Sequence, residues 1–177
     1  MNAMFTERID RMQTIDRHVI GPGDGDTVQL FRLGVRFLVD GDATGGRFSL
    51  VEHPLPPRAL GAPPHTHVHE DEYSFVLEGR IGLQIGDEVI EAGPGDLVLK
   101  PRGIQHAFWN AGGEPARVLE IISPAGFENY FRELAPLLAA GDRDGVGEVA
   151  SRYELEIDFS TIPALAERHG LKVAAPA

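Results

Sequence analysis

The chain contains no cysteine, carries few basic residues and lacks any long apolar run. Without cysteine, the 177-residue protein forms neither disulfides nor a thiolate zinc site. Its 16 Lys and Arg stand against 27 Asp and Glu, and the net charge of −11 argues against nucleic acid or an anionic membrane as a partner. No apolar stretch approaches the roughly 20 residues that cross a membrane, and the first residues lack the pattern of a signal peptide. We therefore expect a single soluble, cytoplasmic domain.

Short runs in which apolar and polar residues alternate dominate the chain up to about residue 125, as in half-buried β-strands. Strands are expected at 29–40, 47–53, 95–100, 106–110 and 116–122. A hairpin is expected to begin at Ile81, turn at Gly86-Asp87 and return from Val89. Many short, evenly spaced strands without an internal repeat predict a mainly β sandwich or barrel.

The remainder of the chain changes to a helical period. Apolar residues from Phe127 to Leu138 fall on one helical face, and Gly141 is a stop signal. Pro136 is expected to kink or split this helix. Two further helices are expected, over 144–153 and from about Ser160 to His169.

These patterns divide the chain into three parts. Residues 1–28 are expected to form an arm, residues 29–125 a barrel, and residues 126–177 a helical tail packed on the barrel. The simplest role of the tail is to cover one end of the barrel. Closing a pocket and joining a homodimer are the alternative roles.

Residues suited to metal binding are concentrated in two segments, PPHTHVHEDEYSFVLEG (63–79) and GDLVLKPRGIQHAFWN (95–110). His65 and His67 have the same strand parity, so their side chains face the same way. Glu72 opens the next extended run and His106 a later one. Three imidazoles and one carboxylate, all facing inward from three strands of a curved sheet, predict a site for one divalent transition metal: Fe, Mn, Ni, Co, Cu or Zn.

The same segments resemble the two motifs of the cupin family. The second motif, G-x5-P-x-G-x2-H-x3-N, fits through Gly95, Pro101, Gly103, His106 and Asn110. The first, usually written G-x5-H-x-H-x(3,4)-E-x6-G, fits at His65, His67, Glu72 and Gly79, whereas Ala59 stands at the leading glycine. The resemblance implies a single cupin barrel, that is, a double-stranded β-helix or jelly roll, with a short C-terminal helical tail.

A second alignment of the first motif begins at Gly61 and uses His67 and His69. It recovers the leading glycine but leaves only two residues before Glu72. The spacing to the closing glycine favours His65 with His67, and the replacement of His65 by His69 stays open at this point.

Other residues have simpler interpretations. The remaining histidines, His18, His53 and His169, are interpreted as structural. Phe108 shares the strand face of His106, and it has two equal interpretations, as pocket wall or as barrel core.

The single-barrel length, the motif pair and the aromatic-rich segment 126–141 are similar to the monocupins related to quercetin 2,3-dioxygenase. In that family three His and one Glu hold the metal, and a flavonol is deprotonated as dioxygen opens its ring. The resemblance implies an oxidoreductase, a dioxygenase of a small phenolic or enolisable substrate. Glu72 is the expected catalytic base, because it is the only ligand able to leave the metal and accept a proton. The alternatives are a cupin isomerase or decarboxylase and a non-enzymatic small-molecule binding protein.

Overall fold

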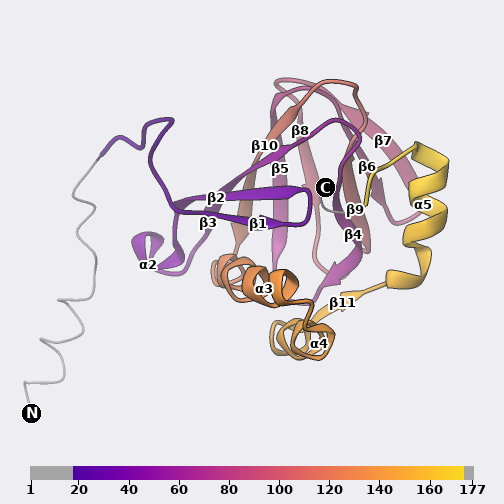
Figure 1. The fold of residues 1–177 in the computed structure, drawn as a ribbon. Helices are drawn as coiled ribbons and strands as arrows, with labels where there is room; N and C mark the ends of the chain where they lie inside the picture. The colour runs from indigo at the N-terminus through magenta and orange to yellow at the C-terminus, as the bar shows by residue number, and fades with distance from the viewer. Residues whose placement is uncertain (1–17, 174–177) are drawn as a thin grey trace, which may run out of the picture.

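The computed structural model describes residues 18–173, so most of the predicted N-terminal arm, residues 1–17, lies outside the described residues. Two antiparallel sheets face each other (Figure 1). The six-stranded sheet contains, in spatial order, β1 (Thr27–Leu30), β2 (Leu33–Val39), β3 (Ser49–Leu55), β10 (Ala116–Ser123), β5 (Asp71–Glu78) and β8 (Leu97–Lys100). The five-stranded sheet contains β11 (Leu155–Ile157), β4 (Leu60–His67), β9 (His106–Asn110), β6 (Ile81–Ile85) and β7 (Glu88–Ala92). This arrangement confirms the predicted mainly β jelly roll.

The inner faces of the sheets follow the predicted alternation. Along β5, Glu72, Ser74 and Val76 are buried, whereas their neighbours are partly exposed. Strand β10 buries every second residue in the same way. The apolar residues of these inner faces form one main core between the sheets, so a polar side chain on an inner face lies inside the barrel.

The prediction of a single strand over 29–40 is wrong. The segment forms the antiparallel pair β1 and β2, with Leu30 opposite Leu33 and a turn at Phe31 and Arg32. Phe31 lies in the left-handed region, with a φ of +52°. A two-residue turn without glycine continues the alternation of apolar and polar residues, so the pattern hides the turn.

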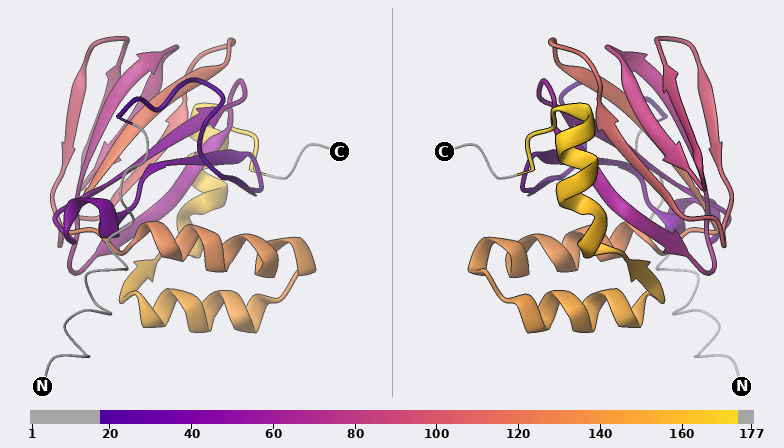
Figure 2. Two further views of the ribbon diagram at one scale, coloured as in Figure 1. Left: turned by 90° about the vertical axis from the view of Figure 1, so that its left-hand side faces the viewer. Right: turned by 90° about the vertical axis from the view of Figure 1, so that its right-hand side faces the viewer.

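Two helices, α3 (Glu128–Ala140) and α4 (Arg143–Arg152), run side by side across one end of the barrel (Figure 2). Helix α3 is continuous through Pro136, which therefore does not split it. The short helices η1 (Phe159–Thr161) and α5 (Ile162–His169) follow, and α5 covers the outer face of the five-stranded sheet. A four-residue helix, α2 (Gly41–Thr44), lies between β2 and β3. No described helix is long and apolar enough to cross a membrane.

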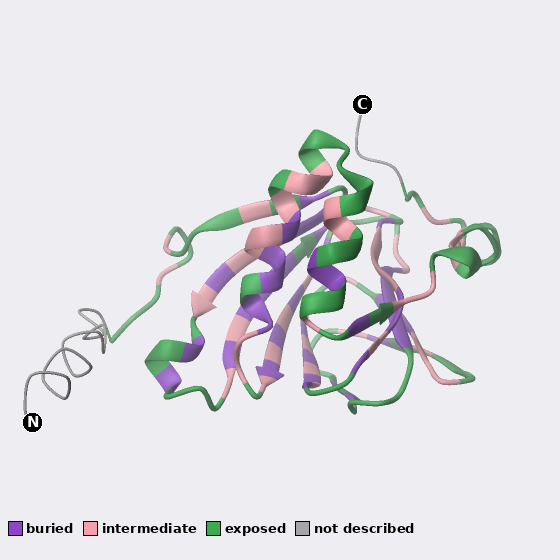
Figure 3. Ribbon diagram, turned by 90° about the horizontal axis from the view of Figure 1, so that it is seen from below, coloured by how far each residue is buried: buried purple, intermediate pink, exposed green. Residues whose placement is uncertain are grey.

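Helix α3 directs its apolar face toward the barrel interior (Figure 3). Phe127, Tyr130, Phe131 and Leu134 are buried and belong to the main core. The rings of Phe127, Tyr130 and Phe131 pack against one another with centroids 4.9 to 6.0 Å apart. The barrel end beneath α3 is therefore closed by aromatic side chains.

Candidate metal centre

Four side chains from three strands meet inside the barrel. His65 and His67 end strand β4, and His106 begins the neighbouring strand β9, directly opposite His65. Glu72 faces them from β5 in the other sheet. One ligand atom from each of the four lies within 4.8 Å of the others, and all four side chains are buried. The structure thus brings together the residues that the sequence singles out.

Each imidazole of the cluster is held through its Nδ1 atom. The Nδ1 atoms of His65 and His106 lie 2.7 and 3.1 Å from the carbonyl oxygen two residues earlier. The Nδ1 of His67 lies 3.3 Å from a carboxylate oxygen of Glu70. Carbonyl and carboxylate oxygens only accept, so each Nδ1 carries the hydrogen and each Nε2 of a neutral ring keeps its lone pair. This arrangement is typical of metal-ligating histidines.

Contacts at the Nε2 atoms test whether a metal fits. Within the described part of the chain, the buried Nε2 of His67 has no hydrogen-bond partner, and it lies 3.4 Å from Oε1 of Glu72. The Nε2 of His106 lies 3.1 Å from Oε2 of Glu72. With Nδ1 protonated, these contacts bring nitrogen lone pairs toward a carboxylate, which is unfavourable unless a cation lies between them. Three nitrogens and one oxygen suit a divalent transition metal, so the residues fit such an ion.

The protonation states favour the same conclusion. Burial, together with the neighbouring His106 and His67, holds the pKa of His65 well below its usual value. Burial also lowers the pKa of His106. Although burial by itself raises the pKa of Glu72, the Lys100 ammonium group holds it well below the usual range. Neutral imidazoles and an ionised carboxylate are the metal-binding forms.

A buried lysine stands behind Glu72 and was missed by the sequence analysis. The Nζ of Lys100 lies 2.8 Å from Oε2 of Glu72 and 3.0 Å from Oε2 of Glu120. Glu120 in turn accepts a 2.8 Å hydrogen bond from the hydroxyl of Ser74. Burial lowers the pKa of Lys100, but the two carboxylates outweigh it and raise that pKa. Burial raises the pKa of Glu120 to about 7.

Strand parity carries a signal for this network. Lys100 follows Val98 on the inner face of β8, and Glu120 lies between Val118 and Ile122 on the inner face of β10. A single charged residue on an apolar strand face requires a partner when it is buried. The strand pattern therefore indicates that Lys100 and Glu120 each need a partner, but it does not show that they are partners of one another.

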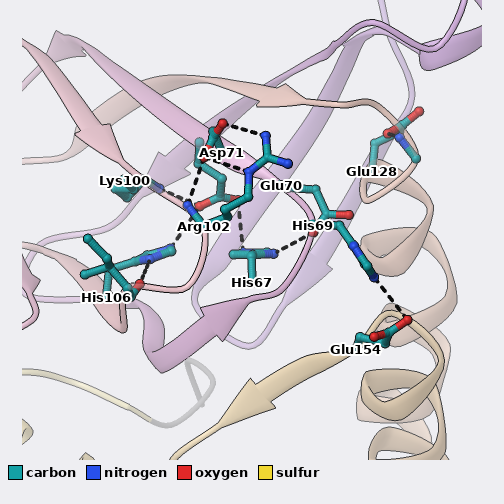
Figure 4. Close-up of polar contacts among 12 residues, drawn as sticks. His67, His69, Glu70, Asp71, Lys100, Arg102, His106, Glu128 and Glu154 are labelled. Carbon is teal, nitrogen blue, oxygen red and sulfur yellow. Dashed lines mark hydrogen bonds and ion pairs between the residues drawn. The ribbon is translucent and has the colours of Figure 1, made fainter.

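His69 lies outside the cluster. Its side chain is about half exposed and its Nε2 lies 3.0 Å from Oε1 of Glu154, so it points away from His106 and Lys100 (Figure 4). The structure groups His65, and not His69, with His67, Glu72 and His106. Gly61, the start of the other alignment, has a packing role, because a Cβ there would lie 2.5 Å from Cε2 of Phe108.

A cavity of about 140 Å³ adjoins the cluster. Its polar wall includes His53, His65, Glu72, Lys100 and Glu120. Its apolar wall includes Phe108 and the aromatic side chains of α3. A recess of about 730 Å³ shares Phe31, Leu138 and Phe159 with this cavity. The structure therefore places Phe108 and His53, the second of which was interpreted as structural, in the wall of the cavity beside the candidate metal ligands.

Comparison with known proteins identifies the fold family. Residues 52–122 match the family model described as Cupin domain. Oxidoreductase OpS7 from Beauveria bassiana is 30% identical over 95 residues, which are 53% of this chain and 27% of OpS7. The tetracenomycin polyketide synthase protein TcmJ from Streptomyces glaucescens is 32% identical over 60 residues, 34% of this chain and 40% of TcmJ. The chain thus spans less than half the length of these curated relatives.

Among solved structures, the polyketide cyclase RemF from Streptomyces resistomycificus is similar, with a TM-score of 0.53 and 30% identity. The similarity covers 60% of this chain and 79% of the RemF chain. The matched cupin domain includes all four residues of the metal cluster. With the two facing sheets and the spacing of both motifs, these matches show that the chain belongs to the cupin superfamily.

Proposed function

We propose that the protein is a metal-dependent dioxygenase that acts on a small phenolic or enolisable molecule. The observation that carries the proposal is the buried cluster of three imidazoles and one carboxylate beside an aromatic-lined cavity. A bound divalent ion in this cluster would stabilise negative charge on a substrate oxygen as a Lewis acid. Apolar side chains make up most of the cavity wall, and electrostatic interactions are stronger in such surroundings than in water.

The residues around the ion have separate roles in this proposal. His65, His67 and His106 would hold the ion through Nε2, and each ring is fixed in orientation by its Nδ1 contact. Glu72 is the proposed base for the ionisable hydroxyl or carbon acid of the substrate. Lys100 holds Glu72 in position, because its Nζ contacts the same carboxylate.

A non-oxidative reaction is the second candidate, and the similarity to RemF favours it. RemF is named a polyketide cyclase, and it is 30% identical to this chain. Ring closure of an enolisable polyketide also needs a stabilised enolate and a positioned base. The name of OpS7, an oxidoreductase, supports the oxidative candidate instead. Both candidates use the same site and differ in their requirement for dioxygen.

Two measurements on the purified protein test the proposal. Elemental analysis should find one divalent transition metal per chain. An oxygen-electrode screen of flavonols, catechols and diketones should then detect metal-dependent oxygen uptake. Conversion of a substrate without oxygen uptake would replace the dioxygenase with the non-oxidative candidate. A chain without stoichiometric metal under all loading conditions would refute both.

The base is tested by Glu72→Gln. The amide keeps the size of the side chain and an oxygen for the metal, but it does not accept a proton at neutral pH. Loss of a positioned general base costs about 10²–10⁴ in rate, so turnover should fall by that order while metal content falls only modestly. Turnover within a few-fold of the parent would remove Glu72 as the base.

A further inference from the structure

The cavity contains a fourth inward-facing histidine that is not part of the metal cluster. His53 lies on the inner face of β3 in the six-stranded sheet and is 2% exposed. It lines the same cavity as His65 and Glu72. Its ring packs edge-on against Phe131 of α3, at 5.5 Å between centroids, and lies 6.0 Å from the ring of Phe108.

The hydrogen bond of His53 defines its tautomer. Nδ1 lies 3.1 Å from the carbonyl oxygen of Gly34 on the neighbouring strand β2. Because a carbonyl only accepts, Nδ1 carries the hydrogen and donates. Burial lowers the pKa of His53 to about 4, so the ring is neutral at physiological pH. Nε2 then keeps a lone pair, and no hydrogen-bond partner for it is found among residues 18–173.

The Nε2 acceptor of His53 has no partner in the part of the protein that the structure describes, and the side chain lines the cavity. A ligand in the cavity with a hydrogen-bond donor would gain a hydrogen bond there. Nδ1 is already hydrogen-bonded to the carbonyl oxygen of Gly34, so Nε2 is the ring nitrogen that can bind a ligand in the cavity. The two rings that pack against His53, those of Phe108 and Phe131, offer no donor.

We propose that His53 is a substrate-binding residue that accepts a hydrogen bond, through Nε2, from a hydroxyl group of the substrate distinct from the group directed to the metal cluster. The proposal rests on the proposed function, because it assumes that the first polar group of the substrate approaches that cluster. It deepens that function by assigning a second polar contact on β3, in the sheet that faces the three histidines of the cluster. The substrate class becomes a hydroxylated aromatic or enolic molecule with at least two hydroxyl groups.

The size of the cavity agrees with one ring of such a molecule. The cavity volume is about 140 Å³, close to the roughly 150 Å³ of an engineered protein cavity that binds benzene. Substituents beyond that ring would extend into the adjoining recess past Phe31 and Phe159. The apolar wall favours the ring, while His53 and the metal cluster select the positions of its hydroxyl groups.

The test uses simple phenols as probes and the full-length protein with its metal. Binding of phenol, catechol, resorcinol and hydroquinone is measured by titration calorimetry, together with the three monomethyl ethers of the diols. The best-placed diol should bind about 5-fold more tightly than phenol, the gain expected from one neutral hydrogen bond. Its methyl ether should lose this gain, because the second oxygen then has no hydrogen to donate to Nε2.

Two variants separate the Nε2 acceptor from the structural bond of Nδ1. In His53→Asn, the amide nitrogen occupies the place of Nδ1 and can still donate to Gly34, but no acceptor remains at the position of Nε2. The gain from the second hydroxyl should disappear, while phenol binds as in the parent. His53→Gln returns an amide oxygen near the position of Nε2 and should recover part of the gain. Thermal unfolding shows that each variant is folded.

Clear outcomes overturn the proposal. It fails if no diol binds at least 2-fold more tightly than phenol, including the case in which none of the probes binds, or if His53→Asn keeps the gain. Nitrogen NMR of the parent gives a further check that needs no variant: Nε2 of His53 must be unprotonated at pH 7, and a protonated Nε2 refutes the proposal. Repeating the titrations after metal removal separates the two proposals, because a gain that persists and depends on His53 supports this site even if the metal chemistry fails.

Discussion

The two sheets of the barrel supply different chemistry to one cavity. The five-stranded sheet supplies His65, His67 and His106, and contacts within three residues along the chain hold each ring. The six-stranded sheet supplies Glu72 and Lys100, which are 28 residues apart in sequence and meet only in the fold. The first wall is built from local contacts and the second from long-range contacts. On the five-stranded sheet (the histidine wall), loss of one histidine should therefore lower metal affinity. On the six-stranded sheet (the charged wall), loss of the lysine that neutralises the carboxylates should lower stability.

The largest expected effect is the loss of a ligand from the histidine wall. In His106→Ala, two imidazoles and Glu72 remain, and metal affinity should fall at least about 100-fold, because even residues that only orient a ligand cost 10- to 100-fold. Metal content after dialysis is the measurement. His18→Ala, which changes an exposed histidine outside the cluster, is the matched control. A full equivalent of tightly held metal in His106→Ala would mean that the centre lies elsewhere.

Removal of the lysine should damage the other wall through stability. Lys100→Met leaves Glu72 and Glu120 buried without their shared cation. Removing one partner of a buried ion pair costs about 3–5 kcal/mol, so the free energy of unfolding of the metal-free protein should fall by about that amount. Urea unfolding in the presence of a chelator measures it.

Two further variants sharpen the result. Lys172→Met changes the only other lysine of the sequence, which is exposed, and should leave stability nearly unchanged. Adding Glu120→Gln to Lys100→Met removes one of the uncompensated carboxylates and should restore part of the loss. Equal stability of Lys100→Met and the parent would show that the buried network contributes nothing to folding.

Acid should weaken the fold through His53. Burial lowers its pKa to about 4, with Lys100 lowering it further and Glu72 and Glu52 opposing. Between about pH 6.5 and 4 the unfolded chain binds a proton at His53 that the folded chain does not, so stability falls as the pH falls. The contribution approaches 1.4 kcal/mol per pH unit. In metal-free protein, His53→Asn should show a flatter pH dependence than the parent, and an identical slope would contradict the assignment.

The smallest expected effect is that of His69→Ala. His69 is exposed, and its contact is with Glu154, on the α4–β11 connection. The hydrogen bond to Glu154 raises the pKa of His69, so the pair weakens as the pH rises through that value. Metal content should equal that of the parent. A marked loss of metal would mean that the Gly61 alignment describes the ligands in solution.

The difference between the walls also explains what the sequence could predict. Strand parity and motif spacing place His65, His67, Glu72 and His106 on inner faces, and the structure brings them together. These signals act over a few residues. The partnership of Lys100 with Glu120 depends on both β8 and β10 pairing with β5, which no local pattern encodes.

The sequence also does not predict the position of His53 in the cavity or the turn at Phe31. The exposure of His53 to the cavity depends on how α3 packs against β3, a contact between distant parts of the chain. The turn at Phe31 was missed for a different reason, since the apolar alternation runs through it unbroken. Tertiary packing decides the first feature, and the absence of a turn-forming residue conceals the second.

Burial of the four candidate ligands would affect how a bound metal exchanges. Glu72 and the three histidines lie inside the barrel, beneath the aromatic face of α3. If release of such a buried ion requires the structure to open locally, the exchange rate follows the opening equilibrium. The ion found after purification would then record which metal was abundant while the chain folded in the producing cell. Refolding the chain in equal mixtures of metals would reveal its intrinsic preference.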